Sequence, residues 1–284
     1  MHIVIPTYGR TTNQTTYWSL TKEARLKTTL VVQHREWLDY WQYSQGTGKG
    51  TGVPFVVLPP HIQTVGPTRQ WIIQNFSGKV LIMDDDLVFA TRRPEEPTKF
   101  LPSTGIDINA MLREIEVHLD LYPVVGLCPR EGGNRKLDSI SENTRIIRVT
   151  GLDTDVLNHY NVRYDRTPVM EDFDMTLQML KLGLPNICLN MWVHNQYASN
   201  SKGGCSTYRT PALQTEAANK LHEFHKPFVK VVKKTTKTAW GGGERTDVVI
   251  QWKRAYKFGQ ANLLDQRKIQ NKADEGSPAT QAME

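Results

Sequence analysis

The chain of 284 residues is 39% hydrophobic and 23% charged, which excludes a fully disordered, collagen-like or membrane-embedded protein. Its length fits one large domain with an appendage. Three widely spaced cysteines without a CxxC pair argue against a disulfide framework and a cysteine-based zinc site, so we expect reduced thiols. The first residues, MHIVIPTYGR, lack the pattern of a signal peptide. We therefore expect a cytosolic protein with no membrane partner.

The net charge of +6 is concentrated in one stretch near the C-terminal end. Residues 1–219 contain 22 basic and 22 acidic side chains, residues 220–258 contain ten and three, and residues 259–284 contain three and four. The local excess of +7 predicts a polyanionic partner that binds apart from residues 1–219. The alternative is a solvated basic surface that only improves solubility.

Apolar runs that end in turn signals predict strands, starting with the run inside HIVIPTYGR and continuing at residues 28–33, 53–58, 79–83, 124–128 and 145–149. Helical patterns separate them at residues 16–27, 34–45, 66 onward, 108–121 and 172–182. This alternation predicts an α/β fold with a mostly parallel central sheet flanked by helices. The glycine-rich segment GTGKGTG at 46–52 lacks the GxxxxGK[ST] order, and we interpret it as a flexible hairpin or lid.

The strongest chemical signal is the run Asp84, Asp85 and Asp86, directly after the apolar strand KVLIM. Three carboxylates at the end of a buried strand repel one another unless a cation or several donors meet them. Mg²⁺ or Mn²⁺ satisfies that requirement with hard oxygen ligands, and such an ion can bridge the phosphates of a nucleotide. Ligands of open α/β sheets sit beyond the carboxyl ends of the strands, where these residues fall. An acidic loop that caps the next segment is the structural alternative.

Two weaker signals follow the aspartate run. Glu171 and Asp172 begin an amphipathic helix that ends at Gly183. The helix dipole alone accounts for acidic residues there, but one of these carboxylates can also act as general base for an acceptor hydroxyl. His194 follows the apolar stretch 187–191 and is either a structural histidine or a further metal ligand.

The order of these motifs resembles the GT-A fold glycosyltransferases. The resemblance covers residues 1–197 and rests on IPTYGR after the first strand, GPTRQW at a helix start, the strand followed by three aspartates, and EDFD before a helix that runs into LKLGLP. The segment 149–185 looks like the acceptor half of family-2-type enzymes. No Gln-x-x-Arg-Trp motif follows the Glu-Asp helix, which argues for a single transfer and against processive polysaccharide synthesis.

The resemblance implies a role for each matched residue. A nucleotide-sugar, a UDP-sugar by default, would be bound by Pro6, Thr7, Tyr8, Arg10, Arg69, Asp84 and Asp85. Mn²⁺ or Mg²⁺ would be held by Asp86, Asp84 and His194. Asp172 would deprotonate the acceptor in an inverting reaction, supported by Glu171 or Asp174.

More narrowly, GPTRQW, DDDL and the basic C-terminal stretch look most like the phage-encoded glycosyltransferases associated with TET-type dioxygenases. That family is implied to attach sugar to 5-hydroxymethylcytosine in double-stranded DNA, in the host cytoplasm for a phage protein. We accordingly divide the chain into a catalytic domain (1–219), a basic acceptor-binding extension (220–258) and a partly disordered tail (259–284). Cations that can neutralise phosphates and aromatics that can stack on bases alternate in the extension, and the expected DNA contacts are Lys233, Lys234, Lys237, Trp240, Arg245, Lys253 and Arg254.

Other functions are consistent with the same residues. The protein can be a glycosyltransferase that acts on a protein or glycan, with the basic stretch only solvated. It can also be a non-catalytic DNA-binding module with a structural acidic cluster. A nucleotidyltransferase is a further possibility, because paired aspartates after a strand also serve two-metal phosphoryl chemistry. The sequence contains no glycine-rich nucleotide motif near its start, which counts against this last function.

Overall fold

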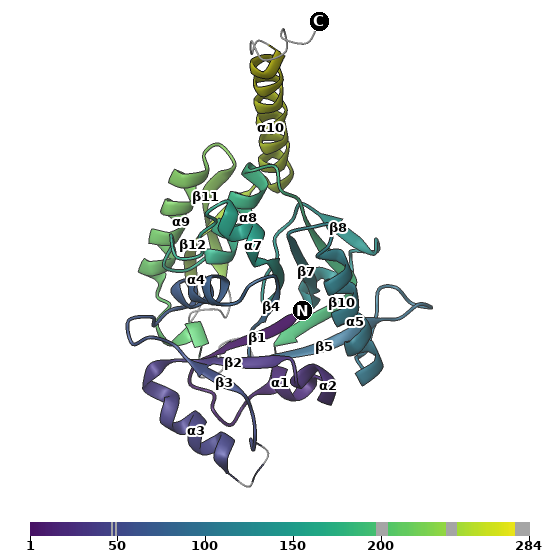
Figure 1. Cartoon of the computed structure of the whole chain (residues 1–284), viewed down its shortest axis with the longest axis vertical. Helices are drawn as coiled ribbons and strands as arrows, with labels where there is room; N and C mark the ends of the chain where they lie inside the picture. Colours follow the sequence, from purple (N-terminus) through teal and green to yellow (C-terminus); the bar gives the residue numbers. More distant parts are fainter. Residues whose placement is uncertain (47, 49, 197–203, 237–242, 276–284) are drawn as a thin grey trace, which may run out of the picture.

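A computed structural model describes residues 1–46, 48, 50–196, 204–236 and 243–275 (Figure 1). Among these residues, no helix combines the length and the apolar character that crossing a membrane requires. Cys128 and Cys188 are buried, and neither forms a disulfide bond. Residues 47 and 49 of the predicted glycine-rich lid, and Lys237 and Trp240 of the predicted DNA contacts, lie outside the described residues.

A ten-stranded sheet forms the centre of the described molecule. In spatial order its strands are β3 (Phe55–Val57), β2 (Thr28–Val32), β1 (His2–Thr7), β4 (Lys79–Met83), β9 (Val149–Asp153), β7 (Val124–Pro129), β10 (Asn186–Gln196), β5 (Leu87–Arg92) and β6 (Phe100–Pro102), with β8 (Ile140–Glu142) also paired to β10. Strands β9, β5 and β8 run against the common direction of the others. The predicted α/β class with a mostly parallel sheet is therefore confirmed.

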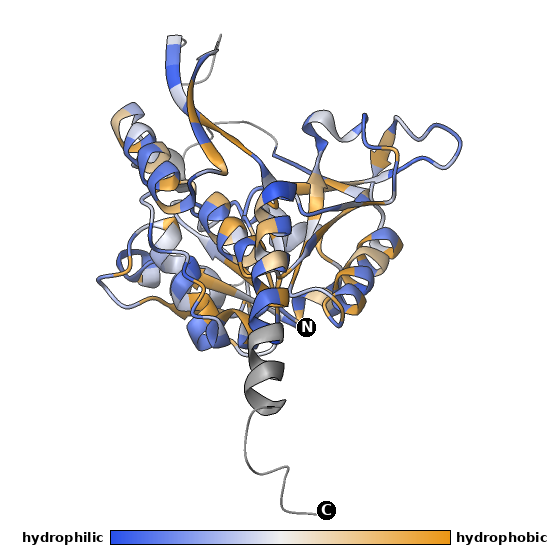
Figure 2. Cartoon of the chain, turned by 90° about the horizontal axis from the view of Figure 1, so that it is seen from above, coloured by the Kyte–Doolittle hydropathy of each residue, from blue (hydrophilic) through white to orange (hydrophobic). Residues whose placement is uncertain are grey.

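Strand side chains alternate between two helical layers, as the two-residue period of an extended chain requires. Ile3 and Ile5 of β1 point into one core and Val4 into the other. Figure 2 shows the hydrophobic residues concentrated on the strands between the layers. The first core is covered by α1 (Thr15–Ser19), α2 (Lys22–Arg25), α3 (Trp37–Gln45) and α5 (Gly105–His118). The second is covered by α4 (Val65–Asn75), α7 (Thr154–His159) and α8 (Glu171–Lys181). Three further short helical segments are η1 (His34–Glu36), α6 (Arg130–Gly133) and η2 (Gly204–Thr207).

Two predicted elements differ from the structure. The helix expected over 16–27 is divided into α1 and α2 at Leu20, which is extended. The strand expected over 145–149 instead starts at Val149, because Arg148 has a φ of 62°, in the left-handed region. A left-handed residue interrupts an extended run, so residues 145–148 form a loop at the sheet edge.

The C-terminal part packs on α8 through a third core. Its elements are α9 (Pro211–His225), the hairpin of β11 (Val229–Thr236) and β12 (Gly243–Ile250), and α10 (Trp252–Glu275). Leu177 and Leu180 of α8 belong to this core together with Leu221, Phe228 and Val248. The predicted boundary between residues 219 and 220 therefore falls inside α9, and residues 259–275 of the predicted tail continue α10, which projects from the body (Figure 1).

Asp174 ties α8 to α9. This carboxylate is completely buried and accepts hydrogen bonds from Arg166 at 2.9 and 2.6 Å, while His225 Nε2 lies 2.7 Å away. Burial alone disfavours the charged form, but the bonds from His225 and Arg166 outweigh it and lower the pKa of Asp174. Asp174 is thus a charged anchor between the sheet-covering layer and the C-terminal part.

Helix α10 crosses the end of α8 at a backbone-to-backbone contact. Gly183 has a φ of 76° and ends α8 as its sequence position predicts. A Cβ placed on Gly259 would lie 2.3 Å from the Gly183 nitrogen and 2.4 Å from the Leu180 carbonyl oxygen. Neither backbone atom can move aside as a flexible side chain can. The crossing therefore requires a glycine at position 259.

We predict that Gly259→Ala destabilises the protein. The same change inside an unobstructed helix stabilises by about 1 kcal/mol, so the sign of the effect is diagnostic. Thermal unfolding should show a lower midpoint for Gly259→Ala. Gly48→Ala is the control, because a Cβ there meets no atom within 4 Å. A midpoint for Gly259→Ala at or above that of the wild type would contradict the packing.

Candidate functional site

A cavity of about 920 Å³ opens at the carboxyl ends of β1, β2 and β4. Loops after these strands, the start of α4, the loop before β9, the first turn of α8 and the segment before α9 surround it. Its polar and charged lining residues include Thr7, Tyr8, Arg10, Gln33, Arg69, Asp84, Asp85, Asp86, Arg145, Arg148, Glu171, Asp172, Gln196 and Arg209. The structure thus brings together every predicted donor-binding residue, including Pro6, and both predicted catalytic carboxylates.

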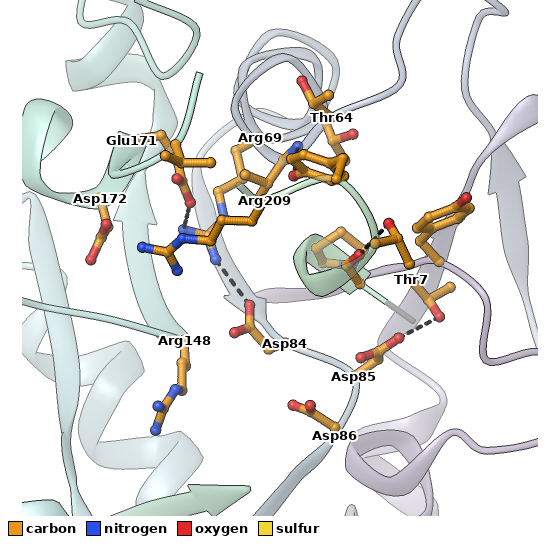
Figure 3. A pocket seen from close by; sticks show the side chains of 18 of the residues that line it. Thr7, Thr64, Arg69, Asp84, Asp85, Asp86, Arg148, Glu171, Asp172 and Arg209 are labelled. Atoms are coloured by element: carbon orange, nitrogen blue, oxygen red, sulfur yellow. Dashed lines mark hydrogen bonds and ion pairs between the residues drawn. The ribbon is translucent and has the colours of Figure 1, made fainter. Parts of the chain in front are cut away.

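Asp84 and Asp85 accept hydrogen bonds from different side chains (Figure 3). Asp84 Oδ1 accepts a bond of 2.9 Å from Arg69, and burial raises the pKa of Asp84. Asp85 accepts a bond of 2.6 Å from the Thr7 hydroxyl and forms an ion pair with Arg10. Burial raises the pKa of Asp85 to about 6, against the opposing charge of Arg10.

Asp86 is reached from two distant segments. Arg10 Nη2 lies 3.1 Å from its Oδ2, and Gln196 Nε2 donates to its Oδ1 at 3.0 Å. His194, the predicted third metal ligand, does not line the cavity. It is completely buried in β10, and burial lowers its pKa to about 3. The structure therefore places Gln196, two residues further along β10, at the aspartate that His194 was expected to approach.

The first turn of α8 presents two carboxylates to the cavity. Its N-terminal flank is Met170, whose φ of 64° turns the chain sharply into the helix. Glu171 Oε1 lies 2.9 Å from Arg69 Nη1, so Arg69 bridges Glu171 and Asp84. Burial raises the pKa of Glu171. Asp174, predicted as a supporting acid, points instead into the core toward His225.

Asp172 is held by a single arginine. Arg145 donates to its Oδ2 through Nε at 2.9 Å and Nη2 at 2.8 Å, and the Arg145 guanidinium lies 3.8 Å from the centre of the Phe173 ring. Within the described residues, Asp172 Oδ1 accepts no hydrogen bond. One carboxylate oxygen is therefore fixed while the other remains available to a ligand.

Sequence reasoning missed Arg145, Arg148, Gln196 and Arg209. Arg145 and Arg148 lie three residues apart in the loop that precedes β9, and β9 is antiparallel to β4, so its start lies at the edge where β4 ends. The only sequence signal for Arg145 and Arg148 was their charge within a segment whose pattern predicts a strand. Arg148 forms a long ion pair of 3.5 Å with the exposed Glu131.

The predicted DNA contacts are distributed over two places. Lys233, Lys234 and Arg245 lie on the β11–β12 hairpin, and none lines the cavity at the aspartates. Lys253 and Arg254 lie in the first turn of α10 and line a second cavity of about 660 Å³.

A cavity beyond the carboxyl ends of the strands of an open sheet, lined by carboxylates and arginines, is the ligand site typical of α/β enzymes. The model of one family, described as TET-Associated Glycosyltransferase, matches residues 1–204. The chain belongs to that family and is a glycosyltransferase.

Two solved structures are similar to this chain at low identity. The first is S. aureus TarS 1-349 in complex with UDP-GlcNAc, with 13% identity and a TM-score of 0.49 over 78% of this chain and 67% of that one. The second is the mannosyltransferase PcManGT from Pyrobaculum calidifontis in complex with GDP-Man and Mn2+, with 11% identity and a TM-score of 0.47 over 78% and 61%. A comparison with curated proteins gave no match.

We predict that Arg69→Met lowers the free energy of unfolding by about 3–5 kcal/mol, because Asp84 and Glu171 lose their shared buried cation. Arg163→Met is the matched control. It removes a partly exposed pair with Asp165, a class of pair worth at most about 1 kcal/mol. Urea denaturation of both variants measures the difference. Equal losses would show that Arg69 does not join the two elements.

Proposed function

We propose that the protein transfers a sugar from a nucleotide-sugar, a UDP-sugar by default, to the hydroxyl of 5-hydroxymethylcytosine in DNA, with inversion. The observation that carries the proposal is the placement of Asp172 in the same cavity as the aspartate run and Arg10. A donor bound at the aspartates would leave its sugar facing Asp172. Family membership supports the transfer, and the cations at the start of α10 support a DNA acceptor.

On the donor side, Thr7 at the end of β1 and Tyr8 and Arg10 in the loop after it would enclose the base and ribose of the nucleotide. Arg148 and Arg209 also line the cavity and would balance the negative charge of the diphosphate. Arg148 suits this role because its long, exposed ion pair with Glu131 costs little to break.

The aspartates fit a divalent cation. Asp84 and Asp86 both line the cavity, and the charge of Asp86 adds to burial in raising the pKa of Asp84, a repulsion that a cation would relieve. Within the described residues, no group of three or more His, Cys, Asp or Glu side chains is arranged to hold a metal. Mg²⁺ and Mn²⁺ suit such a place, since one or two carboxylates, phosphate oxygens and water complete their shell. When bound by Asp84 and Asp86, the ion supplies Lewis-acid stabilisation of the departing diphosphate.

On the acceptor side, Asp172 would take the proton of the attacking hydroxyl on Oδ1. Arg145 binds Oδ2 through Nε and Nη2 and orients the carboxylate. Attack from the face opposite the diphosphate inverts the configuration at the sugar carbon. The cytosine must leave the duplex stack for its hydroxymethyl group to come within hydrogen-bond distance of Asp172.

The proposed activity is tested by incubating DNA that contains 5-hydroxymethylcytosine with a panel of sugar nucleotides and Mn²⁺, followed by mass spectrometry of the nucleosides. We expect a sugar mass added to 5-hydroxymethylcytosine. Matched DNA with cytosine or 5-methylcytosine should gain none, because it lacks the hydroxyl. Sugar-nucleotide hydrolysis without transfer to any DNA would move the assignment to a protein or glycan acceptor.

Two substitutions should separate donor from acceptor chemistry. Asp86→Ala should lower both transfer and metal-dependent donor hydrolysis by roughly 100-fold or more, because several kcal/mol of charge stabilisation are lost. Asp172→Asn should lower transfer by about 10²–10⁴-fold while donor binding stays unchanged, because only the general base is removed. Steady-state kinetics and calorimetric titration of UDP measure the two effects. Undiminished transfer by Asp172→Asn would exclude it as the base.

A further inference from the structure

A second cavity of about 660 Å³ lies beside the first, between β8 and the start of α10. Thr144 lines the second cavity and the next residue, Arg145, lines the first. Phe173 of the first cavity stacks on Trp252 of the second, with ring centres 5.9 Å apart and an interplanar angle of 21°. The stacked pair of Phe173 and Trp252 therefore lies between the two cavities.

That layer connects directly to the proposed catalytic carboxylate. The Arg145 guanidinium lies over the Phe173 ring, and the same guanidinium binds Asp172. Three planar groups, Arg145, Phe173 and Trp252, thus run from Asp172 to the second cavity. A ligand in the second cavity would contact Trp252, and aromatic side chains of this kind accept a stacked nucleobase of any sequence.

The charges of the second cavity are mixed. Lys136, Lys253 and Arg254 line it together with Asp138 and Glu142. In the described part of the chain, neither Lys136 nor Lys253 forms an ion pair with a carboxylate. A bare anion would meet two carboxylates here, whereas a nucleotide offers a phosphate to the cations and base NH groups to the acids.

Asn143 provides an independent indication of a ligand. It lines the second cavity with only 9% of its surface exposed, and its φ of 49° lies in the left-handed region. Its backbone N–H is bonded to the Asn186 carbonyl at 2.9 Å, but its side-chain Oδ1 has no hydrogen-bond partner. A buried acceptor without a donor is costly, and rotation of the Asn143 side chain toward the cavity would let an amino or imino group of a ligand satisfy it.

The hairpin offers less free charge than its composition suggests. Lys234 and Arg245 each lie 3.0 Å from Asp247, and Lys233 lies 3.4 Å from Glu244. These three cations thus share two carboxylates, which offset part of their charge. Lys253 has no such partner among the described residues, and Arg254 only donates to the Gln251 side chain at 3.0 Å. The start of α10 is therefore the better position for a phosphate.

We propose that the second cavity binds the nucleotide that flanks the acceptor cytosine on the same DNA strand. Its base stacks on Trp252 and donates to Asn143, and its phosphate lies against Lys253 and Arg254. The flanking nucleotide thereby fixes the strand while the acceptor enters the first cavity on the other side of Phe173. This inference rests on the proposed function, because it requires a DNA acceptor.

The first test compares two double variants that lose the same charge. Lys253→Ala/Arg254→Ala removes the two cations of the cavity. Lys230→Ala/Lys257→Ala removes two exposed cations that do not line it. We expect the first to raise the KM for 5-hydroxymethylcytosine DNA roughly tenfold and to reduce the salt slope of binding by about two, one unit per lost phosphate contact. The second double variant should change the KM and the salt slope far less. Donor hydrolysis should stay unchanged in both double variants.

The second test removes the base instead of the protein cation. An abasic nucleotide is placed on the 5′ or the 3′ side of 5-hydroxymethylcytosine in otherwise identical DNA. With the wild type, one of the two positions should raise KM roughly tenfold, the size of a lost stacking contact. With Trp252→Leu, which keeps an apolar side chain against Phe173, the same abasic position should bring no further increase. An undiminished abasic effect in Trp252→Leu would overturn the stacking role.

These outcomes distinguish a failure of the flanking subsite from a failure of the proposed function. If the wild type transfers sugar to DNA but both double variants behave alike, the second cavity is not the flanking subsite and the proposed function stands. If the wild type hydrolyses the donor but transfers nothing to DNA and does not bind it at low salt, the proposed DNA acceptor is wrong and the subsite falls with it.

Discussion

The three adjacent carboxylates at the end of β4, of which Asp85 is buried and the other two are partly buried, determine how this molecule is organised, because they repel one another and need cations from elsewhere. Arg69 spans from Asp84 to Glu171 with contacts of 2.9 Å to each. It therefore joins the end of a strand to the start of α8. Arg10 joins the loop after β1 to the end of β4 through Asp85. Arg145 joins the loop before β9 to the start of α8 through Asp172. The charged side chains that suit the cavity to a ligand thus also form the ion pairs that connect its walls.

Helix α8 links this cavity to the C-terminal part of the chain. Its first turn presents Glu171 and Asp172 to the cavity, while Asp174 of the same turn is completely buried and binds Arg166 and His225. Its end meets α10 at Gly183, where two backbones touch. One face of a short helix therefore carries the proposed chemistry and another anchors α9 and α10.

Local sequence patterns were sufficient for the parallel strands, the aspartate run and α8, because apolar periodicity and helix ends are properties of neighbouring residues. They were insufficient where distant segments meet. His194 and Gln196 lie on the same face of β10, and which of them reaches Asp86 depends on the pairing of Gln196 with Leu87 and of His194 with Phe89. That register joins segments more than 100 residues apart, and no local pattern contains it. The interruption at Arg148 is similar, since a left-handed arginine has no sequence signature.

The charge of residues 220–258 shows that the number of cations in a stretch does not tell which of them are available to bind an anion. Counting side chains gives residues 220–258 an excess of +7, which favours a polyanion but does not place it. On the hairpin, Glu244 and Asp247 pair with three of the cations and offset part of their charge. At the start of α10 the cations face a cavity, and Trp252 in the same turn stacks on Phe173 beside Asp172. The position of a polyanionic acceptor therefore depends on which cations lack a partner, and that position adjoins the proposed catalytic base because α8 supplies both Phe173 and Asp172.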